Sequence, residues 1–537
     1  MKKLLFFFFI CHLPFLHAQN VNLTLAGQLS YGTQHTSNIW GWKHPVTGKE
    51  YALVGAANGL SIVDVTNPSA PTQIVEVPAP DSASMNCIWR EVKTWGNFAY
   101  VTTECGSVGL QIIDLINLPS TNLPTTTWTP KFGTDTLKTI HALHIEKGKL
   151  YLYGYGWQKG VLVADVSTTP MIPVFLANYD AGGYIHDGYV QGDTMYAAHI
   201  WAGTVEIADM SNPATPVTLA TFTTPNAFTH NTWLASDNKT LFTTDETANS
   251  YLAAFDISNL NNIAETDRIQ TSPGSNAFVH NTYVVQKNNT DYAVSSWYSE
   301  GFTIVDATRK GNLVQVGNYD TSPFTGADGE KGCWGVYPYL PSGNIIASDI
   351  EQGLFVLTPN YVRACYLEGK VTDCNSGNPV LGVTVKFKIV NPSSSSYIDV
   401  TDAQGDYAIG IDASGTYQVI FSKTGFTTDT DTVVMSAGVV NTHNFQLCPL
   451  GIHESSLHTH VNVFPNPFKE SATLEIKDYV IKNSEFKMFD VFGRVVNSFD
   501  IHDSKFNIER GSLSSGVYFY QIINEGDIIA HGKFCVE

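Results

Sequence analysis

Histidines recur at one position of a repeated segment. His230 lies within FTHNTW and His280 within FVHNTY, so the two stand in the same local sequence. His141 and His186 precede them at similar intervals. Imidazole nitrogens bind Zn²⁺ and other divalent transition metals, so histidines that a fold gathers in one place can form a metal site. The repeat that would gather them is therefore the first question.

The repeat is carried by an apolar run followed by aspartate, usually opened by glycine. Its copies are GLSIVDV (59–65), GLQIIDL (109–115), GVLVADV (160–166), TVEIADM (204–210), YLAAFDI (251–257), GFTIVDA (301–307) and, with Thr358 replacing the aspartate, GLFVLTP (353–359). Further apolar runs in each repeat are separated by Gly, Asn, Asp and Pro turn signals, which predicts four short strands per repeat. Seven such repeats predict an all-β fold with a seven-bladed β-propeller at residues 19–360.

The N-terminal segment complements the last repeat. The seventh repeat stops at Pro359 before a fourth strand, whereas VNLTLAGQLSY (21–31) reads as a strand with no repeat before it. We expect this strand to complete the last blade, which closes the ring and removes an exposed sheet edge.

The repeated aspartates stand where the third strand ends and a turn begins. Aspartate side chains at such positions accept hydrogen bonds from backbone N–H groups. We therefore predict a structural role in the turn for Asp64, Asp114, Asp165, Asp209, Asp256 and Asp306.

The repeated phrase, with NIWGW (38–42) and EYALVGAANGLSIVDV (50–65), resembles the LVIVD-repeat propellers of the choice-of-anchor B family. The resemblance covers about residues 22–360. It implies a secreted or surface propeller with an interchangeable C-terminal anchor, and it implies no particular reaction.

The sequence pattern is different in residues 364–449, where the propeller repeat gives way to CYLEGKVTDCNSGNPVLGVTVKF and then TDAQGDYAIGI. The turn formed by Asp402, Gly405 and Tyr407 carries a resemblance to the carboxypeptidase regulatory-like domain, which implies a small accessory β-sandwich. No peptidase zinc motif accompanies it.

Residues 461–537, after a linker at 450–460, resemble the type IX secretion C-terminal sorting domain of Bacteroidota. The resemblance rests on Pro-Asn-Pro (465–467), Asp-x-x-Gly-Arg (490–494) and Gly-x-Tyr (516–518), and the domain is expected to be a second small β-sandwich. It implies recognition by the type IX secretion machinery and a location outside the cell or on the outer-membrane surface. Residues 1–18, two lysines and an apolar run, read as a secretory signal peptide.

Charge excludes one class of partner. The 537-residue chain has 30 basic and 49 acidic residues and a net charge of −19. Such a surface repels phosphate backbones, so we expect no nucleic-acid ligand. No segment after residue 18 is apolar for long enough to predict a transmembrane span.

Six cysteines lie between the signal peptide and the tail. Cys87 opens the first strand of the second blade and Cys105 follows its second strand, so antiparallel pairing predicts a disulfide between them. The others are Cys333, Cys365, Cys374 and Cys448. We expect one pair among the last three, and the sequence does not choose which.

Alignment of the blades places one residue of each at the start of the first strand, which lines a propeller's channel. These candidates are Arg90, His141, His186, His230, His280 and Trp334, with Asn38 expected in the first blade. Because the second strand runs antiparallel to the first, it ends on the same face. The candidates there are Glu104, His199, Asp245, Glu246 and Asp349.

From this alignment we predict a site at the channel mouth for a divalent metal, Zn²⁺ or Ca²⁺. Its expected ligands are His186, His199, His230, Asp245 and His280. The alternative interpretation is structural, because histidines at a repeated position can hydrogen-bond the backbone of the neighbouring blade. No tight ligand motif such as HExxH is present.

Three functions fit these features. The first is a non-enzymatic surface scaffold that binds a protein, peptide or glycan, and the second is a metal-dependent hydrolase or lyase at the channel mouth. The third is a structural component of the extracellular matrix. The sequence has no GxSxG elbow, P-loop or dinucleotide fingerprint, which favours the scaffold over the enzyme.

Overall fold

The computed structural model describes residues 20–80, 87–180, 183–325, 328–389, 394–450, 460–477 and 479–537. The expected signal peptide and most of the expected linker lie outside these ranges. The chain forms two compact units, one up to Pro449 and one from Leu450 onward.

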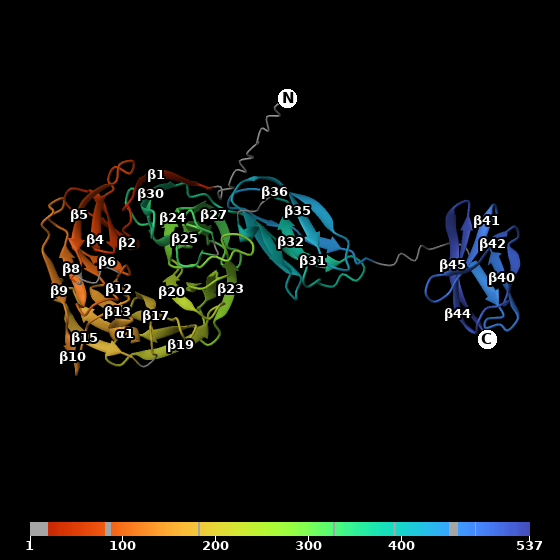
Figure 1. Ribbon diagram of the computed structural model, residues 1–537, viewed down its shortest axis with the longest axis horizontal. Helices are drawn as coiled ribbons and strands as arrows, with labels where there is room; N and C mark the ends of the chain where they lie inside the picture. Colours follow the sequence, from red (N-terminus) through yellow and green to blue (C-terminus); the bar gives the residue numbers. More distant parts are fainter. Residues whose placement is uncertain are drawn as a thin grey trace, which may run out of the picture. The chain divides into compact units, whose positions relative to one another are not determined.

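Seven four-stranded antiparallel sheets make up the first 360 residues, as far as they are described (Figure 1). The first four blades are β2 (Thr36–Lys43), β3 (Glu50–Ala56), β4 (Gly59–Asp64) and β5 (Thr72–Pro78); β6 (Val92–Trp95), β7 (Phe98–Val101), β8 (Leu110–Asp114) and β9 (Thr125–Trp128); β12 (Ala142–Glu146), β13 (Lys149–Tyr153), β14 (Val161–Asp165) and β15 (Val174–Tyr179); β16 (Asp187–Gln191), β17 (Thr194–His199), β18 (Thr204–Asp209) and β19 (Val217–Thr223). The last three are β20 (Thr229–Leu234), β21 (Thr240–Asp245), β22 (Leu252–Asp256) and β23 (Ala264–Ile269); β24 (Thr282–Lys287), β25 (Thr290–Ser296), β26 (Phe302–Asp306) and β27 (Val314–Tyr319); β28 (Cys333–Tyr337), β29 (Ile345–Asp349), β30 (Gly353–Pro359) and β1 (Leu23–Leu29). A two-stranded ribbon, β10 (Lys131–Phe132) with β11 (Asp135–Thr136), and one helical turn, α1 (Tyr155–Gln158), lie in the connections.

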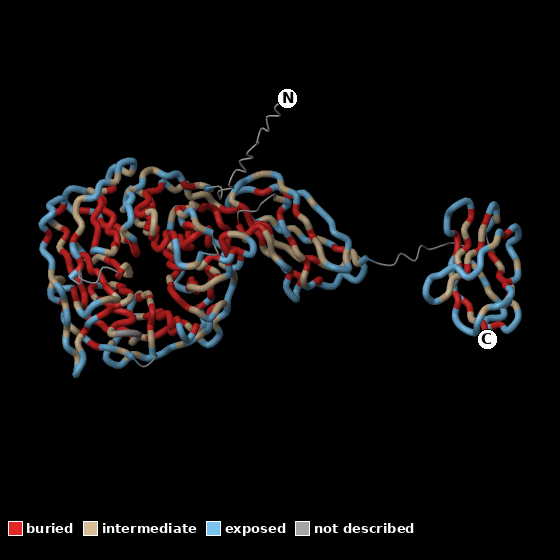
Figure 2. Tube along the Cα trace, viewed as in Figure 1, coloured by how far each residue is buried: buried red, intermediate tan, exposed pale blue. Residues whose placement is uncertain are grey.

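The innermost strands form a closed ring. In order around the ring, each contacts the next: β2, β6, β12, β16, β20, β24, β28 and again β2. Figure 2 shows buried residues on the inner and middle strands and exposed residues at the rim. The all-β prediction is confirmed, and the ring has the arrangement of a propeller with a central channel.

The burial pattern explains the sequence of the third strands. Strands β4, β18 and β26 are buried on both faces because each blade packs between two others, which favours a continuous apolar run over alternation. Each aspartate that follows accepts a hydrogen bond from the backbone N–H two residues on, which confirms the predicted turn role. The aspartates are Asp64, Asp114, Asp165, Asp209, Asp256 and Asp306.

The N-terminal strand is the outer strand of the last blade. Strand β1 pairs antiparallel with β30 from Leu23 opposite Pro359 to Leu29 opposite Leu354. The side chain of Leu23 is buried in the core that the last two blades share.

The first unit continues into a two-sheet sandwich. One sheet has the order β34 (Asp406–Ile411), β31 (Cys365–Asp373) and β37 (Val440–Thr442), with β38 (Phe445–Leu447) also on β31; the other has the order β33 (Ile398–Val400), β32 (Thr384–Phe387), β35 (Gly415–Ser422) and β36 (Asp429–Met435). A short 3₁₀ turn, η2 (Ser395–Tyr397), precedes β33. The backbone N–H of Ala364 donates to Asp306 at 2.9 Å, so the turn aspartate of the sixth blade also holds the start of the sandwich.

The second unit is a smaller pair of sheets with its own core. Strand β40 (Ser471–Lys477) lies between β39 (His460–Phe464) and β43 (Lys505–Glu509), and the second sheet has the order β42 (Val495–Ile501), β41 (Ser484–Phe489), β44 (Gly516–Asn524) and β45 (Asp527–Val536). Phe486, Ile522 and Phe534 are fully buried in it. No helix in the described ranges is long and apolar enough to cross a membrane.

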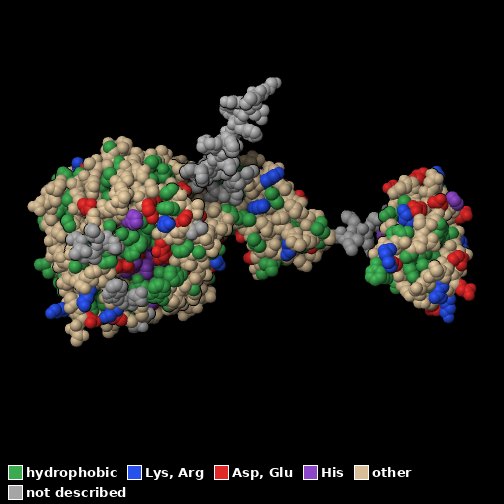
Figure 3. All heavy atoms as spheres, viewed as in Figure 1, with side chains coloured by type: hydrophobic (Ala, Val, Ile, Leu, Met, Phe, Trp, Pro, Cys, Tyr) green, Lys and Arg blue, Asp and Glu red, His purple; other side chains and the backbone are tan. Residues whose placement is uncertain are grey.

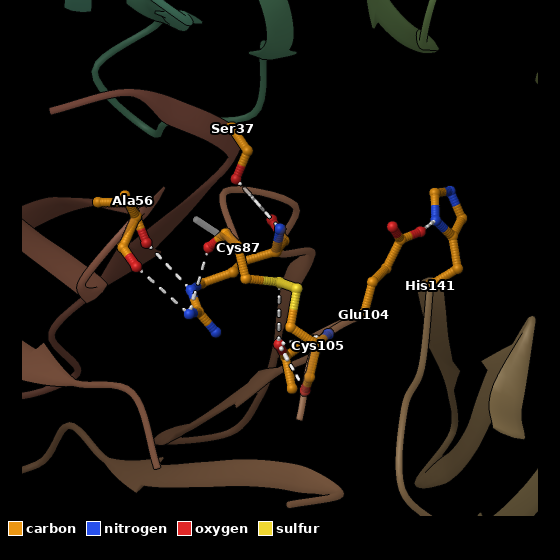
Figure 4. The surroundings of a disulfide bond; sticks show 9 residues. Ser37, Ala56, Cys87, Glu104, Cys105 and His141 are labelled. Carbon is orange, nitrogen blue, oxygen red and sulfur yellow. Dashed lines mark hydrogen bonds and ion pairs between the residues drawn. A yellow bond between two sulfur atoms is a disulfide. The ribbon is translucent and has the colours of Figure 1, made fainter. Parts of the chain in front are cut away.

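Two disulfides are present among the described cysteines. Cys87 and Cys105 are bonded, with Cα atoms 5.8 Å apart, as the strand pairing predicts (Figure 4). The second joins Cys374 to Cys448, one of the combinations that the sequence left open. Cys333 and Cys365 are buried free thiols.

We expect Leu23→Ala to destabilise the propeller by about 2–5 kcal/mol, because it opens a cavity under the strand that closes the ring. Thr24→Ala is the matched control, since the neighbouring side chain is exposed. The measurement is urea unfolding followed by tryptophan fluorescence, and all 10 tryptophans lie between residues 40 and 334, within the propeller. Equal midpoints for the two variants would show that β1 adds nothing to closure.

Candidate functional site

In three blades a local irregularity of the inner strand aims one residue at the channel. The pairing of β20 with β21 skips a residue at His230, and that of β28 with β29 skips one at Trp334. Strand β2 has the same irregularity between Thr36 and Ile39. An extra residue of this kind re-aims its side chain relative to the sheet.

These side chains form an aromatic arc around the channel mouth. Successive ring centroids are 3.8 Å apart for His141 and His186, 4.5 Å for His186 and His230, and 4.2 Å for His230 and His280. Trp334 follows at 4.2 Å from His280. Histidine and acidic side chains gather at the hollow in the middle of this face (Figure 3).

The histidines brace adjacent blades through one ring nitrogen. Nδ1 of His230 lies 3.1 Å from the carbonyl oxygen of His280, and Nδ1 of His280 lies 2.7 Å from that of Trp334. A carbonyl accepts, so Nδ1 carries the proton and Nε2 keeps a lone pair. The structural interpretation of the repeated histidine therefore holds for Nδ1 of these two residues.

A hydroxyl from the second strand of the preceding blade bonds the same carbonyls. Thr244 Oγ1 donates to the carbonyl oxygen of His280 at 2.6 Å, and Ser296 Oγ donates to that of Trp334 at 3.0 Å. Thr102 Oγ1 likewise donates a hydrogen bond to the carbonyl oxygen of His141. The equivalent bond in the last blade runs from Ser348 to Ser37.

Ser37, and not Asn38, therefore holds the equivalent position in the first blade. Its hydroxyl lies 3.2 Å from the carbonyl oxygen of Arg90, as the imidazoles of His230 and His280 bond onward to the next blade. The expectation for Asn38 was wrong by one residue because the irregularity in β2 shifts the alignment. Asn38 instead donates to Glu91 inside the channel.

Two carboxylates reach this arc. Glu246 lies between two imidazoles, with an oxygen 3.5 Å from His230 Nε2 and an oxygen 3.7 Å from His280 Nε2, and it accepts a hydrogen bond from the Tyr298 hydroxyl. Glu104 accepts a hydrogen bond from Nδ1 of His141 (Figure 4).

Three predicted residues do not reach the mouth. His199 Nε2 pairs with Glu206 at 3.1 Å. Asp245 accepts hydrogen bonds from the side chain of Thr224 and from backbone N–H groups of a loop. Asp349 accepts hydrogen bonds from the side chain of Thr321 and from two backbone N–H groups. His199 and Asp245, both predicted as ligands, are thus engaged away from the arc. Side chains alternate along a strand, and the residue that faces the channel after Asp245 is the next one, Glu246.

Arg90 occupies the ring position of the second blade but is bound to backbone. Its Nε donates to the carbonyl of Ala56 at 3.0 Å, and its guanidinium also reaches the carbonyl of Cys87. This binding holds the loop that the Cys87–Cys105 disulfide closes, next to Glu104 (Figure 4).

Burial sets the protonation of the arc. Burial, reinforced by neighbouring imidazoles, lowers the pKa of His186, His230 and His280 well below the usual range. Burial also raises the pKa of Glu246 to about 8, despite the hydrogen bond from Tyr298. Burial opposes the charge on His141, but its bond to Glu104 outweighs burial and raises its pKa. Three of the four imidazoles are therefore neutral near pH 7.

A second layer of charged side chains lies one residue further along the inner strands than the histidine arc. It was not predicted from the sequence. Asp187 follows His186 and accepts a hydrogen bond from Asn231, the asparagine of the first HNT, at 2.7 Å. Lys93 pairs with Glu91 at 3.0 Å. The signal that could have found this layer is the residue directly after each ring position, because it starts the inner strand.

The far end of the channel is filled with aromatic rings. Lys93 Nζ lies 4.4 Å from the ring centre of Trp40, which packs edge-on against Tyr283 at 6.0 Å. Trp233 contacts Tyr283 at 4.8 Å and Tyr339 at 6.4 Å. The histidine arc lies at the other end of the channel. A cavity that admits about one water-sized occupant lies there, lined by His141, Asp187, His230, His280 and Trp334 among others.

Comparison with known proteins identifies three modules. Residues 46–77 match the LVIVD repeat, residues 366–448 match the carboxypeptidase regulatory-like domain, and residues 462–537 match the secretion system C-terminal sorting domain. The sorting-domain match indicates type IX export to the extracellular or outer-membrane surface.

Among solved structures, the chain is similar to the β-propeller domain of Cps50 (Swd1) from Myceliophteria thermophila. The match has 11% identity and a TM-score of 0.43, and it covers 62% of this chain and 99% of that one. No curated protein matches the sequence.

We expect Thr244→Val to destabilise the propeller by about 1–2 kcal/mol, because the buried carbonyl of His280 loses one of its two donors without a change in side-chain shape. Thr221→Val on the outer strand β19, where the side chain is exposed, is the control and should change stability by less than about 0.5 kcal/mol. Both are compared by tryptophan fluorescence in urea, and equal losses would mean that the inter-blade bond is dispensable.

Proposed function

We propose that this chain is an exported binding scaffold whose ligand contacts the channel-mouth face of the propeller. Trp201 carries the proposal. It is 62% exposed, and among the propeller aromatic side chains whose burial is described, those outside 157–158, it is the one more than about a third exposed. Exposed tryptophans are typical of binding surfaces, since the indole supplies a large flat contact area.

Trp201 belongs to an aromatic platform beside the histidine arc. It follows β17, which ends at the mouth, and it stacks on Tyr184 at 6.3 Å and meets Phe228 edge-on at 5.5 Å. Tyr184 in turn contacts His186 at 5.7 Å. The platform, Tyr184, Trp201 and Phe228, is thus fixed by packing before any ligand arrives, which lowers the entropy cost of binding.

The export signal agrees with a ligand outside the cell. A protein, a peptide and a glycan are all compatible with a flat aromatic platform next to polar groups, because each offers apolar faces and hydrogen-bonding groups together. The charge of −19 disfavours a nucleic acid.

Trp201→Ala should lower ligand affinity at least about tenfold, or 1.4 kcal/mol, and leave the melting temperature unchanged. Residues 20–537 are first applied to glycan and peptide arrays, and each ligand found is then titrated calorimetrically against the native chain and the variant. The matched control is Ile172→Ala, which removes an apolar side chain that is 71% exposed away from the platform.

Ligands that bind Trp201→Ala and the native chain equally would move the binding surface elsewhere on the chain. Arrays without any ligand would contradict the scaffold and favour the matrix component.

A further inference from the structure

We propose that the histidine arc binds one divalent transition-metal ion of the Zn²⁺ class, with His230, His280 and Glu246 as ligands. The inference is independent of the ligand of the aromatic platform, because it rests on different residues. Its basis is the placement of three donor atoms, the unsatisfied nitrogen among them and the bonds that hold them in place.

The donor spacing fits a small ion. Bonds of about 2.1 Å in a tetrahedral site put ligand atoms about 3.4 Å from one another. Glu246 oxygens lie 3.5 Å from His230 Nε2 and 3.7 Å from His280 Nε2. These separations exceed a hydrogen bond and are close to the edge of a zinc tetrahedron, so a small rotation of each side chain completes the geometry.

One ligand nitrogen has no other partner. Nε2 of His280 is buried and makes no hydrogen bond to any described residue, although His280 is only 2% exposed. A buried polar atom without a partner costs about 1–3 kcal/mol. A metal ion bound to its lone pair removes that cost.

The surroundings hold the ligands as a metal site requires. The Nδ1 bonds to the carbonyls of His280 and Trp334 fix the tautomer of both imidazoles and aim Nε2 at Glu246. The Tyr298 hydroxyl orients the carboxylate by donating to it. Hydrogen bonds of this kind behind the ligands are the usual support of a bound metal.

A second set of donors shares His230. His141, His186 and His230 also offer nitrogens that lie within 4.8 Å of one another. A single lone pair on His230 Nε2 serves one ion, so the two sets describe one site with neighbouring imidazoles within reach for the remaining coordination positions.

The donor types select the metal. Neutral imidazoles with a single carboxylate suit Zn²⁺, Cu²⁺ or Ni²⁺, whereas Ca²⁺ takes six to eight oxygen ligands. The site therefore favours Zn²⁺ over the Ca²⁺ that the sequence left open.

The test uses residues 20–537, stripped with a chelator and titrated with ZnCl₂ by calorimetry, with metal content determined by mass spectrometry. We expect about one Zn²⁺ per chain, with CaCl₂ giving no heat. His230→Gln should abolish binding, and Glu246→Gln should weaken it at least about tenfold. His199→Gln is the matched control, because His199 is also buried and bonded to a glutamate but lies off the arc.

A second readout guards against misfolding of His230→Gln. Visible absorption of Co²⁺ bound to the native chain should show tetrahedral bands, and Glu246→Gln, which keeps the Tyr298 contact, should lose intensity with an unchanged metal-free melting temperature. Zinc binding that is equal in native, Glu246→Gln and His230→Gln chains, or that His199→Gln removes, would overturn the proposal, as would a chain that binds no zinc.

Discussion

The propeller depends on hydrogen bonds that run from one blade to a backbone carbonyl at the start of the next inner strand. The carbonyls of His280 and Trp334 each accept two such bonds, one from a hydroxyl and one from an imidazole of the preceding blade. A carbonyl buried between blades must be satisfied, and here the repeat itself supplies both donors. Because the imidazole donates through Nδ1, its Nε2 has to face the channel. The candidate metal site is therefore a geometric consequence of the way the ring is held together.

The structural and the metal-binding interpretations of the repeated histidine concern different nitrogens of one ring. Bracing accounts for Nδ1 and for the rest of the repeated HNT, since Asn231 binds Asp187 and Thr232 binds the carbonyl of Tyr196. It does not account for the unpartnered Nε2 of His280. Nor does it account for Glu246, whose carboxylate oxygens lie 3.5 Å from His230 Nε2 and 3.7 Å from His280 Nε2. A carboxyl placed among neutral imidazoles against its own solvation is what a bound cation would compensate.

The parts of this arrangement that depend on strand periodicity could be predicted from the sequence, and those that depend on local irregularities could not. The aspartate turns and the apolar third strands could be predicted because general strand and turn preferences apply to every copy of the repeat. Whether Asp245 or Glu246 faces the channel depends on the direction of each side chain at the end of a strand. Whether Ser37 or Asn38 holds the ring position of the first blade depends on an extra residue in β2. Neither has a compositional signal. The Cys374–Cys448 pair was equally out of reach, because it depends on β38 lying parallel to the end of β31.

The division into compact units places the candidate site and the sorting domain in different units. Every residue of the arc and the platform belongs to the first unit, and the sorting domain has a separate core built around Phe486 and Phe534. The sandwich is different, because the start of β31 is held by Asp306 and Glu368 pairs with Arg309 of the sixth blade. Loss of the sandwich would leave the buried carboxylate of Asp306 without one of its donors. The sandwich is thus a structural part of the propeller unit, whereas the sorting domain is a compact unit of its own.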